Sequence, residues 1–175
     1  MLTLLRKQAR KERLTKSFKI WHKLKTMRGF KKAKTILFYA SFDGEVETFE
    51  MIKKALKLGK KIALPKTFKD RKKFFPVLVR SLRRDLETGV YGVREPKTTK
   101  NNVLDIKDID MVVVPALAFD KANYRLGRGK GYYDRFLKQL PPKTLTVGLA
   151  FDFQMVDTIP HIKEHDVPTS CVLAN

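Results

Sequence analysis

The chain has 175 residues, 43% of them apolar, and its 38 lysines and arginines against 18 acidic residues give a formal net charge of +20. No apolar run approaches the roughly 18 residues that cross a bilayer, and no secretory signal pattern is present, so we expect one cytoplasmic domain over residues 1–175 with no membrane contact. The single cysteine, Cys171, excludes an internal disulfide, which fits a reducing compartment. A monomer is the default expectation.

The first segment, residues 1–34, is strongly basic and has helical periodicity. It carries 13 lysines and arginines and a single acid. Apolar residues recur every three or four positions, at Leu14, Phe18, Trp21, Leu24 and Met27. This spacing predicts one broken or two consecutive amphipathic helices packed on the domain. Most of these cations belong to the solvated face, but Arg6 and Arg10 are candidates to reach a phosphate.

The rest of the chain alternates between strand and helix patterns. Short β-branched or apolar runs predict strands over residues 35–40, 61–65, 74–79, 110–115, 145–150 and 171–174. Apolar spacing predicts helices over residues 49–58 and 133–140, and residues 80–88 are expected to form a short polar helix. Residues 66–73 are expected to be a basic loop, residues 89–96 a turn-rich stretch and residues 159–168 a loop. This alternation indicates an α/β fold with a mostly parallel sheet and helices on both faces.

Two acidic residues, Glu45 and Glu47, lie where the first predicted strand crosses to its helix. Ligands of open α/β sheets bind beyond the carboxyl ends of the strands, and a carboxylate there can pair with N–H donors of a bound ring. The same residues would also complement the dipole at the start of the following helix. The spacing leaves both interpretations open.

The stretch FDKANYRLGRGKGYYDRFL, residues 119–137, carries the strongest chemical signal. Three glycines alternate with cations between a predicted strand and a predicted helix, in the order Arg125, Leu126, Gly127, Arg128, Gly129, Lys130, Gly131. Glycines allow backbone N–H groups to face a ligand, a helix start adds its free N–H groups, and guanidinium and ammonium groups suit phosphate oxygens. A glycine-rich turn with a solvated basic rim is the alternative. The cations, Tyr132, Tyr133 and Asp134 together favour a phosphate site.

Two carboxylates are candidates for a metal ion. Asp134 lies one turn into the predicted helix, where it could bind a Mg²⁺ that also coordinates the phosphates. Asp166 is the candidate for a second ligand. His161 and His165 lie near Asp166, but their spacing matches no zinc pattern, so a polar surface loop is favoured for them. The central loop is neither a Walker A nor a G-x-G-x-x-G motif.

Residues 119–135 resemble the signature of the 5-formyltetrahydrofolate cyclo-ligase family. The segments L-R-K-Q-A-R, G-E-V-E-T and P-H-I-K-E-H-D-V-P agree with that family in order and approximate spacing, so the resemblance covers essentially the whole chain. It implies a three-layer α/β sandwich of the sugar-isomerase and coenzyme-A-transferase type. It also implies a reaction in which ATP and 5-formyltetrahydrofolate give 5,10-methenyltetrahydrofolate, ADP and phosphate, with Mg²⁺.

The resemblance also implies roles for individual residues. Those expected to bind ATP are Arg6, Arg10, Arg125, Leu126, Gly127, Arg128, Gly129, Lys130, Gly131, Tyr132 and Tyr133. Those expected to bind the folate are Ala40, Glu45, Arg128, Gly129, Lys130, Gly131 and Tyr132. Asp134 and Asp166 would hold Mg²⁺, and the expected catalytic residues are Arg125, Arg128, Lys130 and Tyr132.

The chain departs from the family pattern at two places. Leu2 stands where the family has a lysine that contacts ATP, and Lys7 is the candidate replacement. Arg94 stands where the family has a proline, which weakens Glu95 as a nucleotide contact.

The implied chemistry needs no protein nucleophile. Phosphorylation of the formyl oxygen gives an iminium phosphate that N10 of the folate attacks, so catalysis would consist of positioning and charge neutralisation. A polyglutamate tail on the folate would be a further anion for the basic surface to attract.

Two other functions stay open. A basic RNA-binding module without catalysis is supported by the charge, but the aromatic residues are not interleaved with the cations as in RNA-binding motifs, so nucleic acid is not the expected partner. A kinase of another small molecule would share the central loop.

Overall fold

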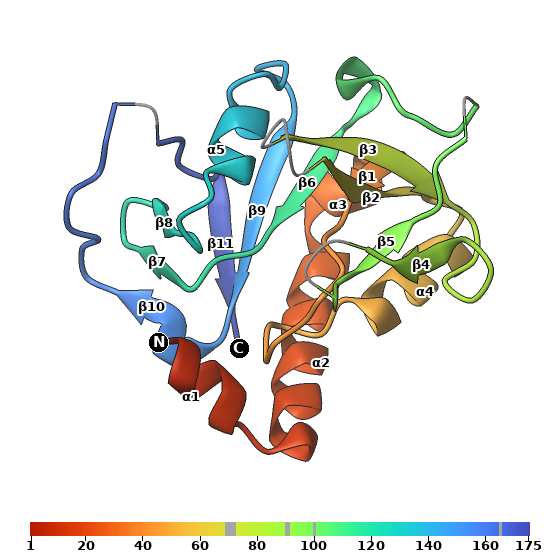
Figure 1. Cartoon of the computed structure of the whole chain (residues 1–175). Helices are drawn as coiled ribbons and strands as arrows, with labels where there is room; N and C mark the ends of the chain where they lie inside the picture. The colour runs from red at the N-terminus through yellow and green to blue at the C-terminus, as the bar shows by residue number, and fades with distance from the viewer. Residues whose placement is uncertain (69–72, 90–91, 100, 165) are drawn as a thin grey trace.

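The computed structural model describes residues 1–68, 73–89, 92–99, 101–164 and 166–175 (Figure 1). Its central sheet has six strands in the order β11-β9-β6-β1-β2-β3. Their bounds are β1 (Thr35–Leu37), β2 (Lys61–Phe68), β3 (Lys73–Val79), β6 (Met111–Val114), β9 (Leu145–Ala150) and β11 (Cys171–Ala174). Only the β2–β3 pair is antiparallel among these strands. The predicted α/β class with a mostly parallel sheet is confirmed.

Two small sheets flank the central one. The first has the order β10-β7-β8, with bounds β7 (Ala118–Asp120), β8 (Arg125–Leu126) and β10 (Met155–Val156). The second pairs β4 (Leu86–Thr88) with β5 (Arg94–Pro96) in antiparallel register. Short 3-10 helices in the connections include η3 (Ile106–Asp108) and η4 (Asp152–Gln154).

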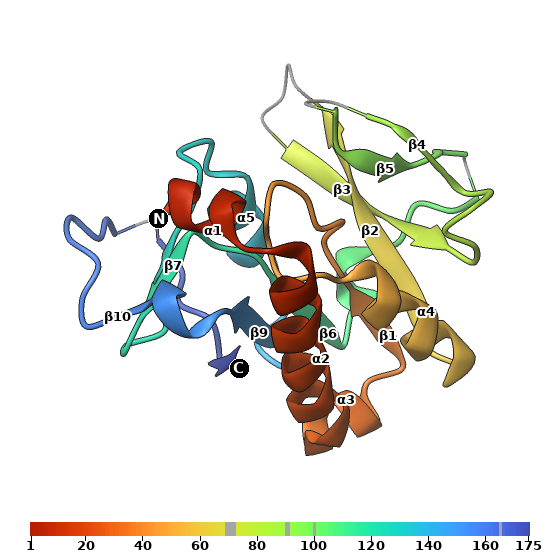
Figure 2. The ribbon, with the colours of Figure 1, turned by 90° about the horizontal axis from the view of Figure 1, so that it is seen from below.

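Helices cover both faces of the central sheet. They are α1 (Leu2–Lys7), α2 (Arg10–Thr26), α3 (Arg28–Lys32), α4 (Phe49–Lys57) and α5 (Tyr132–Leu137). Successive side chains of a strand point to opposite faces. In β6, Met111 and Val113 pack in the hydrophobic cluster that holds residues of α2, α3 and α4, whereas Val112 and Val114 pack with α5. Figure 2 shows α1, α2 and α3 in front of the sheet when the molecule is viewed from below. The protein therefore has three layers.

The amino-terminal segment forms three helices instead of the predicted one or two. The backbone turns extended at Ala9 and again at Met27, where ψ is 136° and 135°. The buried side chains of α2 include Ile20, Trp21 and Leu24, so its carboxyl-terminal half is the part that packs on the sheet. The prediction that Leu14 and Phe18 belong to the packed face is wrong, because these side chains are 40% and 56% exposed.

The helix predicted over residues 80–88 is wrong. The Asp85 carboxylate accepts hydrogen bonds from the backbone N–H groups of Arg80 and Ser81, at 2.7 and 2.8 Å, and so stabilises a turn. Strand β4 follows at once and pairs with β5, which occupies part of the predicted turn-rich stretch.

The remaining predicted elements agree with the structure to differing degrees. The basic loop begins later than expected, because Lys66–Phe68 continue β2, while residues 69–72, 90–91 and 165 lie outside the described part of the chain. Pro76 does lie on an edge strand, β3. In the part of the chain that the structure describes, no helix is both long enough and apolar enough to cross a membrane.

Candidate active site

A pocket of about 210 Å³ opens beyond the carboxyl ends of β1 and β6. These strands are parallel neighbours at the middle of the sheet. The chain proceeds from β1 to β2 on one side and from β6 to β9 on the other, so the pocket lies at the point where the strand order reverses. Pockets that bury a whole drug-sized ligand usually have roughly 300–1,000 Å³. This one suits a part of a substrate, such as a ring system.

The glycine–arginine loop (residues 125–131) is held by a hairpin that the sequence did not predict. Strands β7 and β8 pair in antiparallel register, with Phe119 opposite Arg125. The Asp120 carboxylate closes their turn by accepting from the N–H groups of Ala122 and Tyr124 at 3.0 and 2.9 Å, and Asn123 adopts a φ of 65°. The signal was present in the sequence, because Asp and Asn favour such turns.

Two glycines of this loop need the left-handed backbone region. Gly129 and Gly131 have φ of 78° and 61°, which side chains with a Cβ rarely adopt. Gly131 immediately precedes α5. This helix has six residues and ends at Leu137, three residues before the predicted end at position 140. The phosphate-binding potential of the loop therefore rests mainly on its cations and backbone N–H groups.

Arg125 and Asp134 form a buried ion pair beside the pocket. Their Nη2 and Oδ1 atoms are 2.6 Å apart, and the side chains are 4% and 17% exposed. Burial lowers the pKa of Arg125, while the negative charges of Asp134 and Asp166 oppose that change. Asp134 and Asp166, the two candidate metal ligands, therefore both lie close enough to affect the pKa of the Arg125 guanidinium group.

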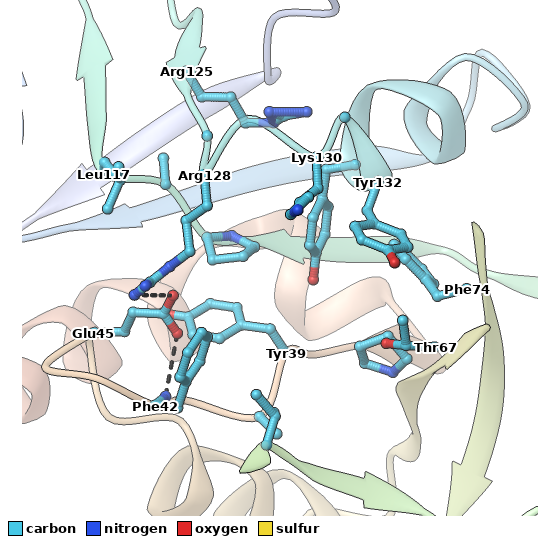
Figure 3. Close-up of a pocket in the computed structure, with 18 of the residues that line it drawn as sticks. Tyr39, Phe42, Glu45, Thr67, Phe74, Leu117, Arg125, Arg128, Lys130 and Tyr132 are labelled. Carbon is cyan, nitrogen blue, oxygen red and sulfur yellow. Dashed lines mark hydrogen bonds and ion pairs between the residues drawn. The ribbon is translucent and has the colours of Figure 1, made fainter. Parts of the chain in front are cut away.

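Arg128 and Glu45 face each other across the pocket (Figure 3). Arg128 lies over the ring of Phe42 at 4.3 Å and approaches Glu45 to 3.7 Å. Burial raises the pKa of Glu45 to about 7, although the backbone N–H of Phe42 and the charge of Arg128 oppose the rise. At neutral pH this carboxyl group is therefore close to its point of half-protonation, and it can either donate or accept a hydrogen bond.

Aromatic side chains form much of the remaining wall. Tyr39 donates its hydroxyl hydrogen to the Val46 carbonyl at 3.1 Å. Tyr133 packs against Phe74 with ring centroids 5.2 Å apart, and burial raises the pKa of its hydroxyl. That hydroxyl is buried and has no hydrogen-bond partner within the described ranges. In Figure 3, Lys130 and Tyr132 approach from one side of the pocket and Tyr39 and Thr67 from the other.

The structure brings most of the sequence-predicted site residues together. The pocket is lined by Ala40, Glu45, Arg125, Gly127, Arg128, Lys130, Gly131, Tyr132, Tyr133 and Asp134. The predicted residues outside this lining are Arg6, Arg10, Leu126, Gly129 and Asp166. Arg6 reaches the rim through Asp43, whereas Arg10 is exposed at the start of α2.

Several lining residues were missed from the sequence. Tyr39 and Phe42 flank the predicted Ala40, so their proximity was a usable signal. Thr67 and Phe74 come from the long β2–β3 pair, and no sequence pattern indicated that this pair reaches the site. Glu95 also lines the pocket and is 3% exposed, near Lys66 at 3.6 Å, although it was judged a weak candidate from the sequence.

Comparisons with known proteins identify the family of the chain. The model of the 5-formyltetrahydrofolate cyclo-ligase family matches residues 1–175. The chain belongs to this family. A 5-formyltetrahydrofolate cyclo-ligase of Haemophilus influenzae is 36% identical over 145 residues, covering 82% of this chain and 76% of the relative.

Solved structures of the family have the same fold. The 5,10-methenyltetrahydrofolate synthetase of Aquifex aeolicus superposes with a TM-score of 0.85 at 34% identity, covering 99% of this chain and 84% of the other. The synthetase of Mycoplasma pneumoniae gives a TM-score of 0.77 at 25% identity, covering 98% and 92%. The mixed α/β architecture with its mostly parallel sheet is thus shared across the family.

Proposed function

We propose that this protein cyclises 5-formyltetrahydrofolate to 5,10-methenyltetrahydrofolate and converts ATP to ADP and phosphate. In addition to family membership, one structural observation supports the proposal. A single pocket presents Glu45 and an aromatic wall on one side and the cations of the glycine–arginine loop on the other. This arrangement suits a flat heterocycle next to a polyphosphate.

The folate ring fits the apolar end of this pocket. Tyr39 and Ala40, which follow β1, and Tyr132 would contact the ring. Glu45 would pair with ring N–H donors, which accounts for a buried carboxyl group without a full ion-pair partner. The alternative role of Glu45 is to complement the dipole of α4. We favour the ring contact, because three residues separate Glu45 from that helix.

ATP phosphates would lie against the loop. Arg128 and Lys130 supply charge, Arg125 organises the site from its buried position, and Arg6 adds a guanidinium group at the rim. Backbone N–H groups would come from Leu126, Gly127, Gly129, Gly131 and Tyr133. Arg10 is a more peripheral candidate, since it lies outside the pocket lining.

Asp134 and Asp166 would hold Mg²⁺ together with the phosphates. The described residues contain no group of three or more metal-ligating side chains, so the protein alone supplies too few ligands for a closed metal cage. Two hard carboxylates fit an ion that keeps its waters and shares phosphate oxygens. Bound there, Mg²⁺ would neutralise phosphate charge during transfer.

The chemistry follows from the electrophile. A formamide carbon is weakly electrophilic because N5 donates its lone pair into the carbonyl group. Transfer of the γ-phosphoryl group from ATP to the formyl oxygen releases ADP and gives an iminium phosphate. N10 then attacks that carbon and loses its proton, and cleavage of the carbon–oxygen bond expels phosphate and leaves the methenyl bridge. The cations and Tyr132 would stabilise charge on the transferred group.

We also propose that residues 1–175 work as one domain of the sugar-isomerase and coenzyme-A-transferase type. Leu5, Ile20 and Leu24 of the basic amino-terminal segment are fully buried in the same cluster as the sheet, which supports a single unit. We propose a cytoplasmic monomer that acts on folate with or without a polyglutamate tail.

Absorbance at the methenyl-folate band tests the function. Mixing the protein with 5-formyltetrahydrofolate and Mg-ATP should raise the absorbance only when ATP is present. The rise should be lost in Arg128→Ala and Lys130→Ala and kept in Lys121→Ala, whose side chain is 79% exposed. A flat trace with a phosphorylated small molecule would favour the kinase, and a flat trace with salt-sensitive RNA binding would favour the RNA-binding module.

A further inference from the structure

The turn at Asp43 and Gly44 connects α1 with the glycine–arginine loop. Arg6 of α1 donates to both carboxylate oxygens of Asp43, from Nε to Oδ1 at 2.6 Å and from Nη2 to Oδ2 at 2.9 Å. Arg128 donates to the same Oδ2 at 2.8 Å. These hydrogen bonds, that of Arg6 first, lower the pKa of Asp43 to about 2, so the carboxylate stays charged throughout the physiological range.

The backbone of this turn is shaped to receive α1. Asp43 and Gly44 adopt φ of 52° and 85°, both left-handed. A Cβ at Gly44 would collide with the backbone carbonyl oxygen of Leu5. The Gln8 amide donates to the carbonyl of Gly44 at 3.4 Å and to that of Leu5 at 3.3 Å. Helix α1 therefore lies directly against the turn, with Leu5 fully buried as its anchor.

Asp43 is what fixes the two guanidinium groups relative to each other. The Arg6 side chain is 60% exposed and that of Arg128 is 31% exposed, so packing alone leaves Arg6 many rotamers. Holding such a side chain in one rotamer before ATP binds reduces the conformational entropy that is lost in the binding step. The shared carboxylate places both cations at one edge of the pocket.

We propose that Asp43 is a positioning residue for ATP: it couples α1 to the glycine–arginine loop and presents Arg6 and Arg128 as a pair to the phosphates. The inference rests on the proposed function, because it assigns those phosphates as the ligand. It explains how a short amino-terminal helix outside the pocket lining contributes to the site.

Asp43→Asn is the informative variant. Asn keeps the shape of the side chain and also tolerates the left-handed backbone, but it removes the charge and replaces one of the two acceptor oxygens with an N–H donor. We expect the KM for ATP to rise about tenfold, the size of one charge-assisted hydrogen bond, while kcat stays within about twofold. Arg6→Gln should raise KM similarly. The double variant should add little, because both changes remove the same coupling.

A second readout does not depend on activity. Amide hydrogen exchange in residues 2–7 should be faster in Asp43→Asn than in the wild-type protein, with no change in β6 or β9. The matched control is Asp157→Asn, which breaks the exposed Lys121–Asp157 pair, 2.7 Å apart, and should alter neither exchange in α1 nor KM.

The outcomes separate this inference from the proposed function. A wild-type protein that forms no methenyl-folate with ATP contradicts the proposed function, and the exchange experiment then still decides whether Asp43 holds α1. With an active wild-type protein, an unchanged KM for ATP in Asp43→Asn overturns the inference alone. A lower KM also overturns it, because Asp43 would then compete with phosphate as an internal anion.

Discussion

Glu45 is a carboxyl group in a buried environment, with 8% of the residue exposed. Its folded-state pKa of about 7 lies above the ordinary glutamate value of 4.5, because burial penalises the charged form. The folded state therefore binds more protons than the unfolded state between these two values. The associated stability is fully present below about pH 4.5 and is lost as the pH rises through 7.

Glu45→Gln should remove this pH dependence. The stability advantage of the wild-type protein relative to the variant should decrease by about 3 kcal/mol between pH 4.5 and pH 8, at 1.36 kcal/mol per unit of pKa shift. Urea unfolding of both proteins at several pH values measures this difference in the free energy of unfolding. A constant difference between the two proteins would show that Glu45 titrates normally.

The Arg125–Asp134 pair should behave as a buried ion pair whose members depend on each other. Arg125→Ala leaves Asp134 without this partner and should lower the free energy of unfolding by about 3 kcal/mol. Arg125→Ala in an Asp134→Ala background should cost at least about 1 kcal/mol less, because no carboxylate is then left unpaired. Additive effects of the two substitutions would contradict the coupling.

The residue chemistry of the site was more predictable than its geometry. Glycines between cations, and acids at a strand end, identified Glu45, Arg128 and Lys130 from the sequence. The bridging role of Asp43 was not predictable, because it depends on Arg6 and Arg128, which are 37 and 85 positions away. Side-chain pairs over such separations are set by the folded chain.

At the scale of elements, α2 shows how packing decides which face of a helix matters. Trp21 is 4% exposed and meets Phe30 edge-on with ring centroids 5.4 Å apart. Trp21→Ala should destabilise the protein by about 3–5 kcal/mol through the cavity it leaves. Phe18→Ala, on the exposed part of the same helix, should change stability by less than about 0.5 kcal/mol. Thermal or urea unfolding compares the two variants with the wild-type protein. Equal losses of stability in both variants would contradict the packing described.

Elements with strong periodicity or a continuous apolar run were predictable, and short ones were not. Strands β6 and β9 are almost entirely buried, and their β-branched runs located them. Strands β7 and β8 have three and two residues, which is too short to show a hydrophobic periodicity. The turn before β4 depends on one carboxylate, that of Asp85, which outweighs the helical composition of its segment.

At the scale of the whole molecule, the net charge of +20 should influence both stability and binding. Self-repulsion of like charges destabilises a compact state, and salt screens it. Raising sodium chloride from about 0.05 to 0.5 M should therefore increase the urea midpoint while raising the KM for ATP. A midpoint that falls with salt would mean that ion pairs outweigh the repulsion.

The proposed mechanism requires that the formyl oxygen is phosphorylated before the ring closes, so the fate of that oxygen distinguishes it from other routes. 5-Formyltetrahydrofolate labelled with heavy oxygen in the formyl group is converted with Mg-ATP, and the released phosphate is analysed by mass spectrometry. Phosphoryl transfer to that oxygen predicts one labelled oxygen in each phosphate formed. Unlabelled phosphate, with the label released in water, would contradict the mechanism.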